Sequence, residues 1–446
     1  MSEPKPGSLP SQPASPSNPS KLPGKPSAEF LRKLAKDRLR EMRSANPAAR
    51  LFQAQLAVAR EHGFGSWRDL VARLNAGQRG KVRRENGRVQ IEGVAPLAWS
   101  GSDCTYLAAM ANVLRVIGPP HDYVRLFGDS ALAFRIRFWA NDAGTASCPS
   151  SAIGEMPPWT DFTERSIGWK MRYEVRLKGT TDDPNDMSDQ LDQVTASIDA
   201  GLPVLGYFIK WDVGVAYGYE GTKLLVRDFH LGNNETLVDI TECRGLFAFF
   251  EERAPVPSRE QSARSAISEA VSRWSHSPDR RPGDGSEGAY YYYGADAYER
   301  WTLLLNRAGG LTPEQQRALL HVDYWTFISL HDARQKAALY LRSITDLFPE
   351  AADALKQAAG IYQQIGEITG MAIHEGEIFP AFYQPDALSK WTPEVRQKEI
   401  ELLNKVRRLD QRAITSLGSA SVPSREDGRA QGAGHQRIGR ERQRLA

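Results

Sequence analysis

The chain has 446 residues, of which 41% are hydrophobic and 25% are charged, and its formal net charge is +3. This length is enough to bury the cores of two or three domains. The nearly balanced charge gives no general attraction to nucleic acid, and no apolar stretch reaches the roughly 18 residues of a membrane span. The three cysteines form no CxxC pair, so we expect no metal site, cofactor or disulfide framework. Without an apolar leader, the sequence indicates a cytoplasmic protein.

The N-terminal region divides into a polar tail and a helical segment. Residues 1–27 are rich in Pro, Ser and Lys and are expected to be disordered. Residues 28–77 predict a small helical unit with a break at Asn46, and a charged linker, 78–88, is expected to end it. The stretch QLAVAREHGFGSWRDLVARL resembles a helical unit that precedes ankyrin repeats in bacterial proteins, although no ankyrin repeat follows.

The stretch SGSDCTYLAAMANVLRVIG places Cys104 directly before a run with helical periodicity. A helix N-terminus favours negative charge by roughly 0.3–1 kcal/mol, and a thiolate is the nucleophilic form of cysteine. The backbone N–H of Cys104 could also hold an oxyanion. Against this, Asp103 places a negative charge beside the thiol, and most free cysteines are inert core residues. The local residues alone therefore slightly favour a buried, unreactive cysteine.

Helix and strand candidates alternate between residues 88 and 255. RVQIEGV, LPVLGYF, DVGVAYGY and TKLLVRDF are expected strands, and an amphipathic helix is expected over 187–200. Arg135 and Arg137 alternate with apolar residues in FRIRFW, which is typical of a strand with two different faces. The functional interpretation of this pair is a binding site for a carboxylate or phosphate of the substrate.

The pattern over residues 290–417 is helical with short links, which predicts an antiparallel helical bundle. One face of this region carries four polar or aromatic side chains at spacings of three or four: His321, Trp325, Ser329 and Asp332. We expect them to form a buried, hydrogen-bonded seam between helices. Residues 419–446 carry many arginines and few apolar residues, so this basic tail is expected to be disordered.

The order of these elements resembles the papain-like cysteine fold. The stretches SDCTYLAAMANVLRVIG, AGLPVLGYF and VGVAYGYEGTKLLVRD are similar to the N-terminal domain of the butirosin biosynthesis acyltransferase family and, more distantly, to bacteriocin-processing peptidases. YYYGADAYERWTLLL is similar to the later part of such acyltransferases, so the resemblance covers roughly residues 90–415. It implies an α+β fold in which a papain-like central domain, 88–255, lies between the N-terminal helical unit and the C-terminal antiparallel helical bundle.

The resemblance also implies roles for individual residues. In that family the cysteine at the helix start is the nucleophile, a histidine opens the first hairpin strand, and an Asp or Asn on the next strand orients it. Cys104 and Asp228 match the first and third roles, whereas Asp212 stands where the histidine is expected. A carboxylate with a pKa of about 4 is a poor proton acceptor for a thiol of about 8.5, which makes His230 the best substitute base.

The register of the hairpin decides whether His230 can serve. With a two-residue loop at Glu220-Gly221, Asp212 faces Phe229, and His230 points to the opposite side of the sheet. With a loop of three residues, Asp212 faces His230 directly, and Asp228 lies on the same face.

Two functions remain open from the sequence. The first is cysteine-dependent acyl transfer, by an acyltransferase or an amide or thioester hydrolase, in which Asp103, Arg135 and Arg137 contact the substrate. Its partners would be a small-molecule or peptide acyl substrate and, as one candidate donor, an acyl-carrier protein, with no nucleic acid or membrane. The alternative is a catalytically inactive papain-like scaffold that acts as a binding module, which Asp212 in the histidine position supports.

Overall fold

The computed structural model divides the chain after Gln78 into two compact units, which are described separately below. The expected disordered tails, 1–27 and the part of 419–446 beyond Ala420, lie outside the described residues. The structure describes residues 28–61, 66–67, 70, 79–98, 101–140, 159–175, 187–210, 212–243, 246–275, 279–280, 290–375 and 383–420.

The N-terminal unit contains the two helices that the sequence predicts, α1 (Ala28–Ala45) and α2 (Leu51–Glu61). The break between them falls at Asn46, whose side-chain Oδ1 accepts the N–H of Ala48 at 3.1 Å. Pro47 follows and disfavours a helical backbone at Asn46, and such local side-chain bonds also compete with helix continuation, so the break falls here. A small core holds the unit together: Leu31, Ala35, Val58, Ala59 and Leu70.

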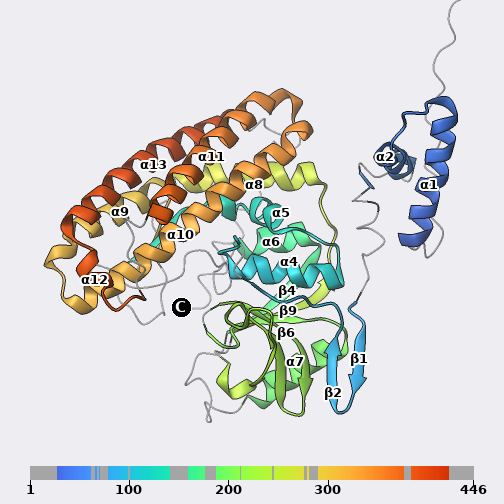
Figure 1. Cartoon of the computed structure of the whole chain (residues 1–446), viewed down its shortest axis with the longest axis horizontal. Coiled ribbons are helices and arrows are strands. Elements are labelled where there is room, and N and C mark those ends of the chain that lie inside the picture. The colour runs from blue at the N-terminus through green and yellow to red at the C-terminus, as the bar shows by residue number, and fades with distance from the viewer. Residues whose placement is uncertain are drawn as a thin grey trace, which may run out of the picture. The chain divides into compact units, whose positions relative to one another are not determined.

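An eight-stranded sheet, antiparallel at every described pairing, forms the lower half of the large unit in Figure 1. Its order is β1-β2-β6-β5-β9-β4, and β7 pairs with both β6 and β8. The strands are β1 (Val82–Glu85), β2 (Arg88–Ile91), β4 (Trp169–Val175), β5 (Val204–Gly206), β6 (Gly214–Glu220), β7 (Lys223–Arg227), β8 (Thr236–Asp239) and β9 (Leu246–Arg253).

The charged segment 78–88 is not the linker that its composition suggests, because β1 lies within it and pairs with β2. Asn86 and Gly87 form the turn, and both have positive φ, 51° and 80°. An Asn-Gly pair with this backbone is the preferred two-residue turn of a hairpin. This turn signal outweighs the charged composition of the segment.

Four helices belong to the same part of the chain as this sheet. One of them, α4, packs against β5 and β6 with ten of its thirteen residues buried. These helices are α4 (Thr105–Ile117), α5 (Tyr123–Asp129), α6 (Trp159–Ile167) and α7 (Ser188–Asp199).

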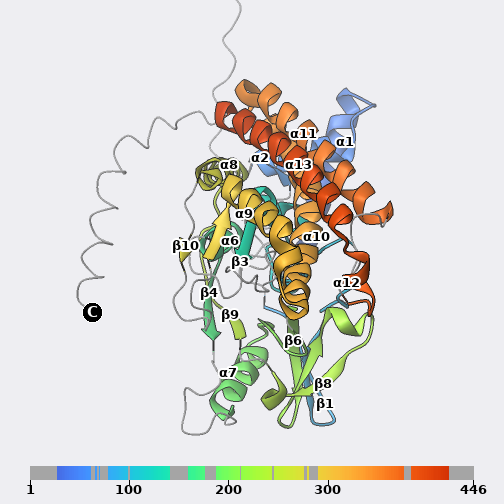
Figure 2. The ribbon, with the colours of Figure 1, turned by 90° about the vertical axis from the view of Figure 1, so that its left-hand side faces the viewer.

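A second, three-stranded sheet has the order β10-β11-β3 and packs against helix α9 (Figure 2). Its strands are β3 (Arg137–Ala140), β10 (Asp279–Arg280) and β11 (Tyr290–Tyr293). The expectation that the helical region begins at residue 290 is therefore wrong for its first four residues. Tyrosine favours strands, and here four consecutive tyrosines pair with β3.

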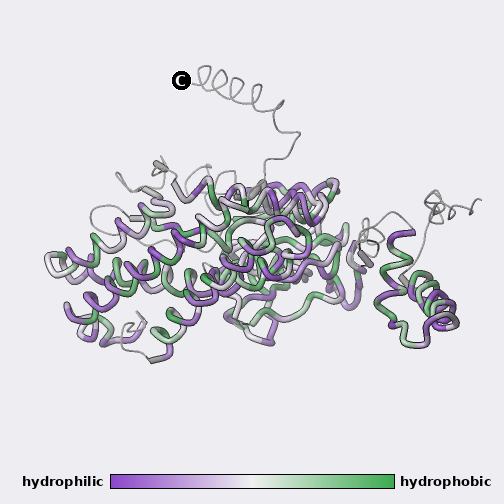
Figure 3. Tube along the Cα trace, turned by 90° about the horizontal axis from the view of Figure 1, so that it is seen from above, coloured by the Kyte–Doolittle hydropathy of each residue, from purple (hydrophilic) through white to green (hydrophobic). Residues whose placement is uncertain are grey.

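The C-terminal helices share one continuous hydrophobic core with the sheet, which extends from Ile91 to Ala420. Along them, hydrophobic and hydrophilic residues alternate in bands, as expected for helices buried on one side (Figure 3). No helix in the described part of the chain is long and apolar enough to cross a membrane. The helices are α8 (Arg259–Trp274), α9 (Gly294–Arg307), α10 (Pro313–Ile344), α11 (Ala352–Glu375), α12 (Ala387–Lys390) and α13 (Pro393–Ala420). Mixed helix and antiparallel sheet is what the α+β class predicts.

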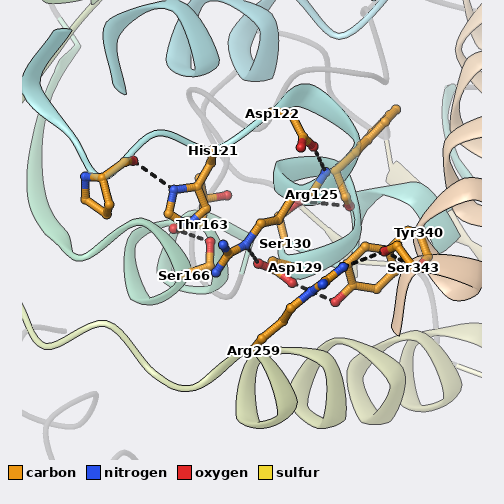
Figure 4. Close-up of polar contacts among 12 residues, drawn as sticks. His121, Asp122, Arg125, Asp129, Ser130, Thr163, Ser166, Arg259, Tyr340 and Ser343 are labelled. Carbon is orange, nitrogen blue, oxygen red and sulfur yellow. Dashed lines mark hydrogen bonds and ion pairs between the residues drawn. The ribbon is translucent and has the colours of Figure 1, made fainter. Parts of the chain in front are cut away.

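Buried polar contacts attach α10 to α5 (Figure 4). The hydroxyl of Tyr340 on α10 donates to Oδ1 of Asp129 at 2.6 Å, and Nε of Arg125 lies 3.1 Å from Oδ2 of the same carboxylate. Nearby, His121 is buried, and its Nδ1 lies 2.9 Å from the carbonyl oxygen of Pro119. The long helix α10 is thus fixed to the segment that follows α4.

Candidate functional site

Cys104 is the residue that precedes the first turn of α4, with extended backbone angles of φ −84° and ψ 90°. The position at the helix start agrees with the sequence pattern. The residue is fully buried, with 0% of its surface exposed. In this conformation the sulfur does not lie in an open groove, as a nucleophile waiting for substrate would.

The backbone N–H of Cys104 is hydrogen-bonded to the side chain of Tyr123. The hydroxyl oxygen of Tyr123 accepts this N–H at 2.9 Å and donates its own proton to Oδ2 of Asp332 at 2.5 Å. Tyr123 is the first residue of α5, and Asp332 belongs to α10, more than 200 residues further along the chain. The expectation that the Cys104 N–H is available to an oxyanion is therefore wrong for this conformation.

Asp103 and Lys336 complete this group of polar residues. The N–H of Asp103 also donates to Oδ2 of Asp332, at 3.1 Å, and Nζ of Lys336 lies 2.8 Å from Oδ1. Burial raises the pKa of the Asp103 side chain to about 7, and repulsion by the Asp332 carboxylate adds to this, while Lys336 lowers it. Asp103 therefore lies beside a second carboxylate, an arrangement that favours the protonated form of the Asp103 side chain.

The hairpin of β6 and β7 meets α4 directly. The N–H of Val213, just before β6, donates to the side-chain oxygen of Thr105 at 3.1 Å. Thr105 follows Cys104 and Val213 follows Asp212, so each of these two predicted site residues adjoins one partner of the bond. The structure thus brings the helix start and the hairpin together.

The observed hairpin register matches neither predicted loop. Glu220 pairs with Lys223, so the turn residues are Gly221 and Thr222. A bulge between Ala216 and Gly218 then shifts the pairing by one residue, and Ala216 pairs with Val226. The pairing ends at Val215 and Arg227, and His230 lies beyond it in the short 3-10 helix Phe229–Leu231, so His230 meets Asp212 outside the strand ladder.

Asp212, His230 and Asp228 form a compact cluster at this end of the hairpin. Nε2 of His230 lies 2.7 Å from Oδ2 of Asp212, and the backbone N–H of His230 donates to Oδ1 of Asp228 at 2.9 Å. Burial raises the pKa of Asp228, the hydrogen bond and charge of His230 lower it, and Asp212 raises it. Because it contacts Nε2, the carboxylate of Asp212 is placed to orient the His230 ring.

Arg135 and Arg137 are both buried, with 8% and 2% of their surfaces exposed. Phe134, Ile136 and Phe138 are buried too, so this segment does not have the solvent-facing side that its alternation predicts. The two arginines line a cavity of about 20 Å³ together with residues of α10. Such a volume holds about one water molecule, which is smaller than a carboxylate or phosphate group.

Tyr123 and Lys336 are not among the predicted site residues, and the sequence pattern predicts only a structural seam for Asp332. The ion pair of Asp332 and Lys336 could have been predicted, because the two residues are spaced by four on a helix. Nothing local links them to Tyr123, however, because that contact depends on how α10 packs against α5.

Comparison with protein-family models and with curated proteins gave no match. Among the described residues, no group of three or more His, Cys, Asp and Glu side chains is arranged to hold a metal ion. The geometry of Cys104 and of the Asp212–His230–Asp228 cluster is therefore the evidence that bears on function.

Proposed function

We propose that this protein is a papain-like, cysteine-dependent acyl-transfer enzyme that acts on a small-molecule or peptide acyl substrate. The observation that supports the proposal most directly is the bond between Thr105 and Val213, which joins the Cys104 helix start to the hairpin that carries His230. A nucleophile, a base and a group that orients the base are the elements of such a site. Cys104, His230 and Asp212 would fill these roles.

In the proposed site, the histidine and the carboxylate exchange the positions that they have in the family pattern. The carboxylate lies at the first hairpin strand, and the histidine follows the second. Asp212 lies before the first hairpin strand and holds Nε2 of His230, so Nδ1 is the nitrogen that would take the thiol proton. The Cys104 sulfur would then attack the acyl carbonyl carbon and form a thioester, while His230 passes its proton to the leaving amine, alcohol or thiol. An acceptor nucleophile or water would release the acyl group in a second step. Asp228, which accepts the His230 N–H, would fix the backbone of the base.

Acyl-enzyme formation tests this proposal. We expect the wild-type protein, incubated with an acyl thioester of N-acetylcysteamine, to gain the mass of one acyl group on Cys104. Cys104→Ala should show no such adduct, and His230→Ala should form it about 100-fold more slowly, the lower end of the usual effect of a general base. Equal acylation of Cys104→Ala and wild type would exclude the proposal.

A second candidate, a catalytically inactive scaffold that binds a ligand, is favoured by a specific observation. Cys104 is fully buried, and its N–H is bonded to Tyr123. For such a scaffold we expect no acyl adduct with any thioester. A ligand found by thermal-shift screening should then raise the Tm of wild type and of Cys104→Ala equally, because the thiol would contribute nothing to binding.

A further inference from the structure

We infer that Tyr123 and Asp332 form a latch that keeps Cys104 closed, so that the C-terminal helices control the reactivity of the thiol. The inference rests on the proposed function in one respect: it assumes that the oxygen of an acyl substrate binds beside the Cys104 N–H. The latch itself is defined by contacts among described residues of α4, α5 and α10.

One position beside the Cys104 N–H cannot hold two oxygen atoms. The hydroxyl oxygen of Tyr123 lies 2.9 Å from the Cys104 nitrogen, which is the distance at which the oxygen of an attacked carbonyl would accept the same N–H. Substrate must therefore displace Tyr123 before this N–H can stabilise an oxyanion.

Asp332 determines where the Tyr123 hydroxyl lies. The bond from the Tyr123 hydroxyl to Oδ2 of Asp332 is 2.5 Å long, as is typical of a hydroxyl that donates to a carboxylate. Burial raises the pKa of Tyr123 well above its usual value, and the nearby Asp332 charge adds to this, so the hydroxyl keeps its proton. Asp332 is thus a positioning residue that acts on Cys104 through Tyr123.

Asp332 is itself held in place. Only 2% of its side chain is exposed, and Lys336 and the N–H of Asp103 each contact one of its two oxygens. Lys336 also lies 5.8 Å from the centre of the Tyr123 ring. Because Asp332 and Lys336 both belong to α10, movement of that helix relative to α5 would release Tyr123.

The chain offers a matched control for the latch. Tyr340 and Asp129 form a second tyrosine–carboxylate bond between α10 and α5, of 2.6 Å, with donor and acceptor on the opposite helices. Both side chains are buried, and Figure 4 shows the bond between them; no described bond joins either one to Cys104. Tyr340→Phe therefore removes an equivalent interhelical hydrogen bond without opening the Cys104 site.

The test measures the rate at which iodoacetamide modifies Cys104 in the full chain at pH 7.5, followed by peptide mass spectrometry. Cys243 serves as an internal reference, because burial raises the pKa of its thiol to about 12. We expect Tyr123→Phe to speed modification of Cys104 at least about tenfold relative to wild type and to Tyr340→Phe, because a hydrogen bond to the helix start is lost. Asp332→Asn keeps the shape of the side chain but removes its charge, and should give a smaller increase in the rate of Cys104 modification. It replaces Tyr123→Phe in the test if that variant does not fold.

The outcomes separate the latch from the proposed function. If the Cys104 rate in Tyr123→Phe and Asp332→Asn stays equal to that in Tyr340→Phe, the latch is wrong, whether or not acyl-enzyme forms. If the two variants label rapidly but no variant accepts an acyl group from the thioester, the latch stands and the acyl-transfer proposal fails. Similar Tm values for Tyr123→Phe and Tyr340→Phe would show that faster labelling does not come from general unfolding.

Discussion

Asp228 illustrates how one buried carboxylate can support the site at a cost in stability. None of its surface is exposed, and its Oδ1 accepts the backbone N–H of His230. Burial raises the pKa of Asp228, so the folded protein binds a proton at this group more tightly than the unfolded chain does. Its contribution to stability is therefore most favourable at low pH and falls as pH rises through its folded pKa.

For Asp228→Asn we expect a neutral side chain that keeps an oxygen acceptor for the His230 N–H. The Tm of this variant relative to wild type should rise between pH 4 and pH 7, because only the wild type acquires a buried charge over that interval. Differential scanning calorimetry at both pH values measures this. Asp228→Ala, which leaves the N–H without its acceptor, should instead lose about 1 kcal/mol. An Asn variant with the same Tm offset at both pH values would contradict this account.

Single residues also show where sequence reasoning succeeds and where it stops. The place of Cys104 at a helix start follows from local periodicity, and the adjacency of Asp212 and His230 is one of two pairings that hairpin geometry allows. How the two side chains meet depends on a bulge between Ala216 and Gly218 and on the short 3-10 helix after β7, and no residue type marks either feature. The contact between Tyr123 and Asp332 depends on packing between distant helices, so no local pattern could predict it.

At the scale of elements, α10 and α13 are joined across their interface by a pair of buried carboxyl groups. Asp323 on α10 and Glu399 on α13 both have 0% of their surface exposed. Nε1 of Trp301 donates to Oδ1 of Asp323 at 2.6 Å, and the charge of Arg396 acts on Glu399 in the direction that lowers its pKa. Burial raises the pKa of Asp323 to about 6, and burial together with the charge of Asp323 raises the pKa of Glu399 well above its usual value. The folded pair thus retains protons that the unfolded chain releases.

Because both pKa values are raised on folding, the pair contributes most to stability at low pH, and this contribution is lost as pH rises through the folded values. Glu399→Gln keeps the volume and removes one ionisation. We expect its Tm at pH 8 to exceed that of wild type by about 2 °C, which corresponds to about 1 kcal/mol in a large domain, with a smaller difference at pH 4.5. Glu401→Gln, an exposed position on the same helix, is the control. A difference that is constant with pH would show that the two carboxyl groups are not the cause.

At the scale of the whole molecule, the large unit has two halves: the C-terminal helices, and the preceding part of the chain, which contains the eight-stranded sheet. A buried ion pair lies where they meet. Arg334 on α10 and Asp410 on α13 have side chains with 0% exposure, and their closest atoms are 2.5 Å apart. The same guanidinium donates to the carbonyl oxygens of Ala133 and Arg135, at 3.0 and 2.9 Å, in the segment that leads into β3. Arg334 therefore holds the C-terminal helices to the chain that follows α5, and the continuous core predicts that both halves unfold together.

Removing Asp410 tests this cooperativity, because it leaves the Arg334 charge buried without its carboxylate partner. Breaking such a pair costs about 3–5 kcal/mol, so Asp410→Ala should lose stability by that order. In native-state hydrogen exchange, the amides of β6 and those of α11 should lose protection by the same free energy, although Asp410 lies on neither element. Asp386→Ala breaks an ion pair whose two side chains are 54% and 55% exposed, and should change stability by less than about 1 kcal/mol. If protection falls in α11 but not in β6, the C-terminal helices unfold independently of the sheet, and the contact of Asp332 on α10 with Tyr123 would then be lost while the sheet stays folded.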